Sequence, residues 1–374
     1  MAVTLPAPAR LSAADAAARR RRRLPLVALA VAIGLAGLWG GLIRLGLVPE
    51  TALATAGDQH GPLLALGFLG TLISLERAVA LDRGWAYAAP LATGAGAVAV
   101  LAGAPTELGP ALTVLGGLVL VGAHVAIDRI QRSVHNVVMG LGALSWCAAA
   151  AMWLADADVS RFAPLMAGFL VATIVGERLE LTRAAGRTAA QRRLLVATVA
   201  VLTVGLAISI VATRTGMRIA GAGMLGQGLW LLRHDLARRT VRIAGVTRYI
   251  ALALLSGYAW LVCGGALWLA LAPLADGPAY DAALHAVFLG FVASMVLAHA
   301  PVIVPAVLRV PFPFHRRMYA PLALLQASLL VRLAGGDLAG SGALWRWGGA
   351  VNVLALLLFG AAVAVGIRQP AGHV

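Results

Sequence analysis

Long apolar runs alternate with short polar segments along almost the whole chain. A run of about 18 or more apolar residues with few charges is typical of a helix that crosses a membrane. The pattern therefore predicts twelve membrane-spanning helices, at about residues 25–47, 60–82, 85–104, 109–128, 134–155, 161–180, 193–213, 217–234, 248–273, 280–305, 319–334 and 343–367.

The composition favours a polytopic membrane protein over a soluble enzyme. Hydrophobic residues make up 61% of the chain, charged residues only 12%, and the mean hydropathy is +0.88. The net charge of +15 comes from arginine alone, because the chain has no lysine. No interleaved aromatic and basic surface suggests nucleic acid, so the expected partner is the lipid bilayer. Cys147 and Cys263 lie inside apolar runs and are expected to pack rather than to form a disulfide or bind a metal.

Arginines are distributed unequally between the predicted loops. The N-terminal segment ends in a run of arginines, Arg19 to Arg23, and most later arginines fall in the loops on the same side of the predicted bundle. Positive residues concentrate on the cytoplasmic side, so both termini are expected there. We predict a basic tail over residues 1–24, one transmembrane domain over 25–368 and a short tail over 369–374.

A short motif recurs in the second, sixth and tenth predicted spans. It reads GFLGTLISLER over residues 67–77, GFLVATIVGER over 168–178 and GFVASMVLAH over 290–299. Because an interval of four spans gives successive units the same orientation, their symmetry axis must run along the membrane normal. We expect an all-α fold of three tandem four-helix units in pseudo-threefold arrangement, at about residues 25–132, 133–242 and 247–368.

Two histidines lie near the predicted outer ends of spans two and ten. His60 stands at the start of span two, and His285 is about one turn into span ten. An imidazole is costly in hydrocarbon and normally faces protein, water or a bound metal. Two imidazoles on facing helices suit the axial ligation of a haem, and small residues beside them, such as Gly61 and Gly290, leave room for the flat ring. Alternatively, His60 caps its helix and His285 bonds to neighbouring helices.

Glu76, Glu177 and His299 occupy equivalent places in the three copies of the motif. If the three helices surround the pseudo-symmetry axis, these side chains converge at the inner end of the bundle. Carboxylates with an imidazole suit iron, manganese, copper or zinc, and they equally suit a proton relay. The alternative is a local ion pair between each glutamate and the arginine after it. His124, one turn before Asp128, is a further candidate metal ligand.

Familiar catalytic motifs are missing from the sequence. It has no Walker A, GxSxG, HExxH or EF-hand pattern and no CxxCH attachment site. This argues against an NTPase, a serine hydrolase, a zincin and a covalently attached haem. Trp85, Trp345 and Trp347 fit anchors at the membrane interface.

Two stretches resemble known families. The run HAVFLGFVASM at residues 285–295 resembles the H-A-x-x-x-G-x-x-x-x-M helix of the NnrS family, twelve-span haem- and copper-containing proteins linked to nitric oxide and nitrosative stress in denitrifying bacteria. The run HGPLLALGFLGTLI at residues 60–73 is similar to the second helix of haem-copper oxidase subunit I, where helices two and ten supply the axial ligands of a haem.

The resemblance implies a haem b held by His60 and His285, a copper or other transition metal, and a small diatomic or other small-molecule ligand. It also implies a location in the bacterial cytoplasmic (inner) membrane. The competing class is a proton-coupled secondary transporter or exporter without a prosthetic group, and a third is a structural membrane subunit.

Overall fold

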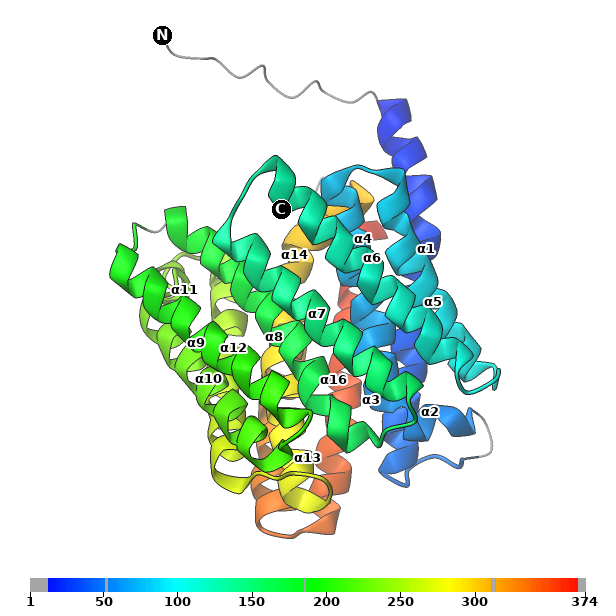
Figure 1. Cartoon of the computed structure of the whole chain (residues 1–374), viewed down its shortest axis with the longest axis vertical. Helices are drawn as coiled ribbons and strands as arrows, with labels where there is room; N and C mark the ends of the chain where they lie inside the picture. Colours follow the sequence, from blue (N-terminus) through cyan, green and yellow to red (C-terminus); the bar gives the residue numbers. More distant parts are fainter. Residues whose placement is uncertain (1–12, 51–52, 185, 311, 313, 369–374) are drawn as a thin grey trace.

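The computed structural model describes residues 13–50, 53–184, 186–310, 312 and 314–368, and all regular structure in this part of the chain is helical (Figure 1). The predicted tail over 369–374 and the first half of the tail over 1–24 lie outside the described residues. From Ala13 the chain is already part of the first helix. The α-helices and short turns are α1 (Ala13–Arg44), α2 (Ala54–Asp58), α3 (His60–Pro62), α4 (Gly70–Leu81), η2 (Gly84–Tyr87), α5 (Ala88–Leu101), α6 (Leu108–Ile130), α7 (Val134–Leu154), α8 (Val159–Ala184), α9 (Ala189–Ser209), α10 (Thr213–His234), α11 (Ala237–Thr240), α12 (Val246–Leu271), α13 (Gly277–His285), α14 (Ser294–Leu308), η4 (Arg316–Met318), α15 (Tyr319–Leu330) and α16 (Gly342–Arg368).

Eleven helical segments in the described part of the chain are long and apolar enough to cross a membrane. The chain therefore has the architecture of a multi-pass membrane protein. The predicted span over 217–234 is the exception: it forms α10, which is helical but more polar because it carries three arginines (Arg214, Arg218 and Arg233). α10 nevertheless packs between α9 and α12, and its glycines permit the close approach. A Cβ at Gly216 would collide with the backbone of α9, and one at Gly221 with the backbone of α12.

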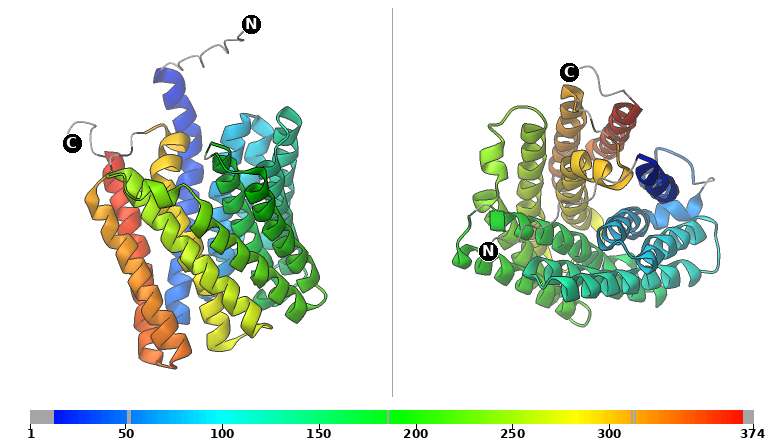
Figure 2. Two further views of the ribbon diagram at one scale, coloured as in Figure 1. Left: turned by 90° about the vertical axis from the view of Figure 1, so that its left-hand side faces the viewer. Right: turned by 90° about the horizontal axis from the view of Figure 1, so that it is seen from above.

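α8 is the most buried of these segments. Within its apolar stretch 83% of the residues are buried, against 22–50% for the other candidate spans. It contacts its neighbours in the chain, α7 and α9, and also α3 and α10, which are more distant in the sequence. In the side view of Figure 2 the long helices run roughly parallel to one another. α8 is thus an inner helix around which the rest of the bundle is packed.

Three spans contain a stretch of π-helix: η1 (Leu63–Leu69), η3 (Ala286–Ala293) and η5 (Val331–Leu338). π-Helical turns are rare and are frequently found at functional sites. η1 begins just after α3, which starts at His60, and η3 begins at the residue after His285. A π-helical stretch therefore begins directly after His285 and three residues after His60.

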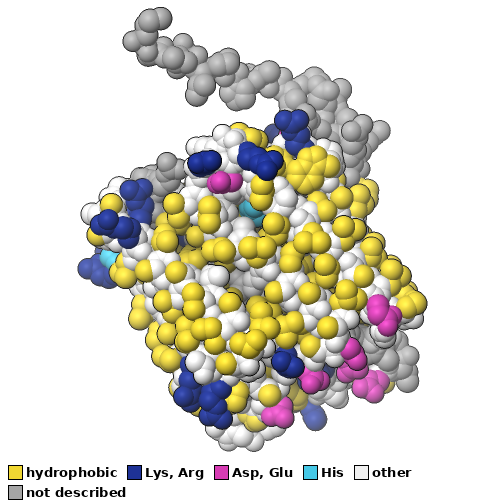
Figure 3. Space-filling view, in the orientation of Figure 1, with side chains coloured by type: hydrophobic (Ala, Val, Ile, Leu, Met, Phe, Trp, Pro, Cys, Tyr) yellow, Lys and Arg dark blue, Asp and Glu magenta, His cyan; other side chains and the backbone are white. Residues whose placement is uncertain are grey.

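Hydrophobic side chains cover the middle of the molecular surface, and charged side chains gather at its two ends (Figure 3). Large apolar residues of the long helices are exposed, among them Leu118 and Val125 on α6 and Leu229 on α10. Such a belt suits contact with lipid, because acyl chains solvate apolar side chains and not charged ones.

Gly40→Ala is expected to destabilise the segment that carries His60. A Cβ at Gly40, on α1, would collide with the carbonyl oxygen of Ala56 in α2 and come within 3.1 Å of the Cβ of His60. Overpacking of this kind typically costs about 1–3 kcal/mol. Gly41→Ala is the matched control, since a Cβ there meets no atom within 4 Å. The midpoints of thermal unfolding in one detergent should differ between the two variants; equal midpoints would show that this contact is unimportant.

Candidate functional site

A partly open cavity of about 720 Å³ lies between several of the helices, and both His60 and His285 line it. Its wall is formed by α1, α3 with η1, α8, α13 with η3, η5 and α16. Its volume falls in the range of about 300–1,000 Å³ that small-molecule and cofactor sites occupy. The two histidines, 225 positions apart in the chain, thus reach one common space.

The cavity has an apolar body and a polar end. The apolar wall comes chiefly from long aliphatic and aromatic side chains (Leu64, Phe68, Met166, Phe288, Val292 and Leu356). The polar groups come from the last turn of α1, the start of α13, and η5 with α16 (Arg44, Asp276, Asp281, Arg332, Asp337, Trp345 and Asn352). Such a space suits a ligand with a large apolar part and a charged or polar edge.

Both imidazole rings are oriented by backbone carbonyls. The Nδ1 atom of His285 lies 2.8 Å from the carbonyl oxygen of Asp281, and that of His60 lies 3.3 Å from the carbonyl oxygen of Gly57. When Nδ1–H donates to a carbonyl, Nε2 is left as an acceptor or metal ligand.

Asp281, one turn before His285, is the centre of a polar cluster at this cavity. Its carboxylate accepts hydrogen bonds from Arg332 Nε at 3.2 Å and Nη2 at 2.8 Å, and from Trp345 Nε1 at 3.0 Å. The Asp281 Oδ1 atom also lies 3.2 Å from His285 Nδ1. The carboxylate therefore links His285 to η5 and α16.

This cluster was not predicted from the sequence. The eleventh span was predicted to end at about residue 334, but η5 continues the helix to Leu338. The Arg332 side chain is only 7% exposed, and Trp345 bonds to Asp281 besides any role as an interface anchor. The one available signal was the four-residue spacing between Asp281 and His285.

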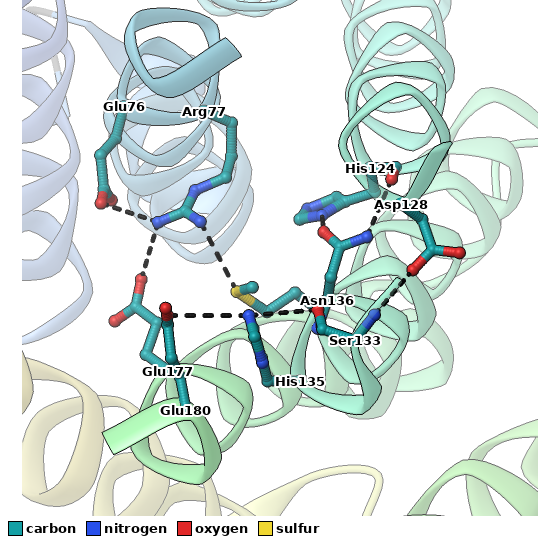
Figure 4. A network of polar contacts seen from close by, with 10 residues as sticks. Glu76, Arg77, His124, Asp128, Ser133, His135, Asn136, Glu177 and Glu180 are labelled. Carbon is teal, nitrogen blue, oxygen red and sulfur yellow. Dashed lines mark hydrogen bonds and ion pairs between the residues drawn. The ribbon is translucent and has the colours of Figure 1, made fainter. Parts of the chain in front are cut away.

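In a second polar network Arg77 joins Glu76 to Glu177 (Figure 4), and His299 lies beside Glu177. Arg77 Nη2 lies 2.7 Å from Glu76 Oε1 and 3.2 Å from Glu177 Oε1. His299 Nδ1 lies 2.7 Å from the carbonyl oxygen of Met295, and its Nε2 lies 3.9 Å from Glu177 Oε2. The structure thus brings these three residues together, with a guanidinium group between the two carboxylates.

His124 lies outside that network. Its Nδ1 atom is 2.9 Å from Asn136 Oδ1, and the Asn136 side chain donates back to the His124 carbonyl oxygen at 2.9 Å. Asp128 accepts a bond from the backbone N–H of Ser133. Figure 4 shows this pair of contacts beside the Arg77 network, with His135 near Glu180 between them. His124 therefore links α6 to α7, and its described contacts do not include His299.

Over the described ranges, no group of three or more His, Cys, Asp or Glu side chains is arranged to hold a metal ion. In the network of Glu76 and Glu177, the Arg77 guanidinium already neutralises part of the negative charge. A metal at this point would have to displace it.

These observations define a multi-pass helical membrane protein with a partly open cavity that two histidines line and a separate, partly buried ionic network. Residues 23–368 match the family described as a domain of unknown function (DUF8744), so the chain belongs to this family. No curated protein matches the chain at a significant level.

Proposed function

We propose that the protein binds a haem b in the cavity, with His60 and His285 as its axial ligands. The observation that carries the proposal is that both imidazoles line one cavity while their Nδ1 atoms are engaged by backbone carbonyls. Histidines that bind a metal almost always donate the other ring N–H in this way, which fixes the tautomer and the ring orientation.

The rest of the cavity fits the same group. The apolar body suits a macrocycle, and the polar end holds Arg44, a cation suited to a carboxylate of the ligand. A bound haem would supply electron-transfer and diatomic-ligand chemistry. The chain itself would hold the macrocycle and fix the orientation of the two imidazoles. Residues such as Phe68 and Phe288 would exclude water.

We infer from the resemblance to the NnrS family that the protein handles nitric oxide or the damage it causes in the bacterial cytoplasmic membrane. The distribution of arginines supports a placement of both termini on the cytoplasmic side. A copper or other transition metal at Glu76, Glu177 and His299 remains a prediction from their residue types. Elemental analysis of the purified protein tests it, because Glu177→Gln should lower the bound metal content while the haem content stays constant.

The protein purified in mild detergent from cells supplied with a haem precursor is expected to show a Soret band. Its haem should be extractable in acid, in stoichiometric amount with the protein, as expected for a non-covalent haem b. A correctly folded, colourless protein that takes up no added haem would refute the proposal. Size-exclusion chromatography establishes folding in each preparation.

A proton-coupled transporter is the second candidate, and the Arg77 network is the observation that favours it. Two carboxylates, one guanidinium and one imidazole lie inside the bundle, where ionisable side chains commonly mark proton pathways. In vesicles loaded with a pH-sensitive dye, an imposed membrane potential should then drive proton entry that Glu177→Gln abolishes. Equal proton entry in the two proteins would count against this function.

We also propose that the fold is built from three tandem four-helix units about an axis normal to the membrane. One feature supports the relation of the first unit to the third: η1 and η3 each begin four residues before the motif glycine, Gly67 and Gly290 respectively. The convergence of Glu76, Glu177 and His299 supports the placement of all three motif helices around one centre.

A further inference from the structure

The two histidines of the cavity are held unequally. His285 Nδ1 is hydrogen-bonded to the Asp281 backbone carbonyl at 2.8 Å and also lies 3.2 Å from the Asp281 carboxylate Oδ1. His60 Nδ1 has only the Gly57 carbonyl, at 3.3 Å. Since N–H···O bonds have an optimum near about 2.9 Å, the ring of His285 is the more firmly oriented of the two.

The Asp281 carboxylate is itself fixed by two other helices. Arg332 in η5 binds it through both Nε and Nη2, and Trp345 in α16 donates its indole N–H. The Arg332 guanidinium also lies 5.7 Å from the centre of the Trp345 ring, a cation–π distance. A bidentate, charge-assisted pair on a side chain that is only 7% exposed is among the strongest polar contacts a protein makes.

α16 and η5 are in turn closely packed. A Cβ at Gly348 would collide with the backbone of Arg332, and one at Gly336 with the backbone of Trp345. The support of His285 is therefore a rigid arrangement of three helical segments, α13, η5 and α16.

His60 has a much smaller support. It starts the continuous helical span over His60–Leu81, and its bonding partner Gly57 lies in the five-residue helix α2 just before it. The backbone at His60 packs against α1, since a Cβ at Gly40 would come within 3.1 Å of the His60 Cβ. Within the described part of the chain, the ring itself makes no hydrogen bond to another span. The ring of His60 is therefore oriented by one carbonyl alone, whereas that of His285 is also held by the Asp281 cluster.

We propose, on the basis of the haem-binding function proposed above, that His285 is the permanent axial ligand and His60 the displaceable one. A small neutral diatomic ligand would then bind on the side of the haem that faces His60. Asp281 acts as a positioning residue: its backbone carbonyl accepts the Nδ1–H of His285, and its carboxylate lies 3.2 Å from the same nitrogen, where a negative charge raises the basicity of the ring. The same effect lowers the reduction potential of the bound haem.

Carbon monoxide is the probe for this assignment. In the dithionite-reduced protein, His60→Ala is expected to retain the haem and to bind carbon monoxide at least about tenfold faster than the wild type, because its displacement step is removed. His285→Ala is expected to lose the haem. If His285→Ala does not fold, as judged by size-exclusion chromatography, His285→Gln replaces it in the same measurements.

Asp281→Asn tests the positioning role separately. It should retain the fold, weaken haem binding by about tenfold and raise the midpoint potential. Glu107→Gln is the control, because Glu107 is an exposed carboxylate that does not line the cavity. It should leave the potential unchanged.

The outcomes distinguish this inference from the function on which it rests. Haem that is retained in His285→Ala and lost in His60→Ala, or equal behaviour of the two variants, would overturn the assignment and leave haem binding intact. An unchanged potential in Asp281→Asn would overturn the role of Asp281. A wild-type protein without any haem would refute the proposed function itself, and this inference with it.

Discussion

Asp235→Ala is expected to destabilise the protein by about 3–5 kcal/mol. Arg178 binds Asp235 through two parallel hydrogen bonds, from Nε to Oδ2 at 3.0 Å and from Nη2 to Oδ1 at 2.9 Å. The two side chains are only 7% and 2% exposed, and Arg178 belongs to the central helix α8. Removal of the carboxylate leaves a buried guanidinium without its counter-charge. Asp235 also accepts the backbone N–H of Ala237 at 2.8 Å, and that bond is lost as well.

The free energy of unfolding and the midpoint of thermal unfolding in detergent would measure this loss. Glu50→Ala is the control, because Glu50 is exposed and its removal should change the free energy by no more than about 0.5 kcal/mol. The double variant Arg178→Met, Asp235→Leu should recover most of the loss, since two apolar side chains of similar volume can replace a buried ion pair. Equal stability of Asp235→Ala and Glu50→Ala would show that the pair is not desolvated.

The helices were predictable because each apolar run is long and is bounded by polar or helix-breaking residues. The two discrepancies both involve arginine. α10 packs between two spans although its exposed residues Arg214 and Arg218 make it more polar than they are, and η5 carries the buried Arg332 into the interior. Hydropathy records how polar a residue is and not whether a partner neutralises it, so it could not distinguish a buried paired arginine from one at the surface.

The cavity histidines could be predicted because imidazole is unusual in an apolar run and both lie at the same end of their spans. Their surroundings could not be predicted in the same way. Arg332 and Trp345 follow Asp281 by 51 and 64 residues. Contacts at such separations depend on how the helices are arranged, which no local pattern encodes.

The two Glu-Arg pairs of the repeated motif show the same limit. By sequence, Glu76-Arg77 and Glu177-Arg178 are equivalent, and the simplest expectation is two local ion pairs. In the structure Arg77 binds both glutamates, while Arg178 turns to Asp235 on another part of the chain. The difference arises from the neighbours that each helix meets, because Asp235 follows α10 and has no counterpart beside Arg77.

Arg77→Gln is expected to cost about 2–4 kcal/mol, less than the loss of Asp235 because the side chains of Arg77, Glu76 and Glu177 are 14–25% exposed. The variant leaves two carboxylates close together without the cation that separates them. Protonation of one carboxylate relieves this repulsion, so the loss of stability should be larger at alkaline pH and smaller in acid. Thermal unfolding in detergent across a pH series would measure it.

The matched control is Arg129→Gln, which removes an exposed arginine and should have little effect at any pH. A second substitution, Glu177→Gln in the Arg77→Gln background, should restore part of the stability and remove most of the pH dependence, because only one carboxylate then remains. If the double variant is no more stable than Arg77→Gln at alkaline pH, the two glutamates do not interact and Arg77 acts through packing alone. Restored stability would instead establish that Arg77 neutralises the charges of Glu76 and Glu177. The inner end of the bundle would then depend on this one guanidinium for its charge balance.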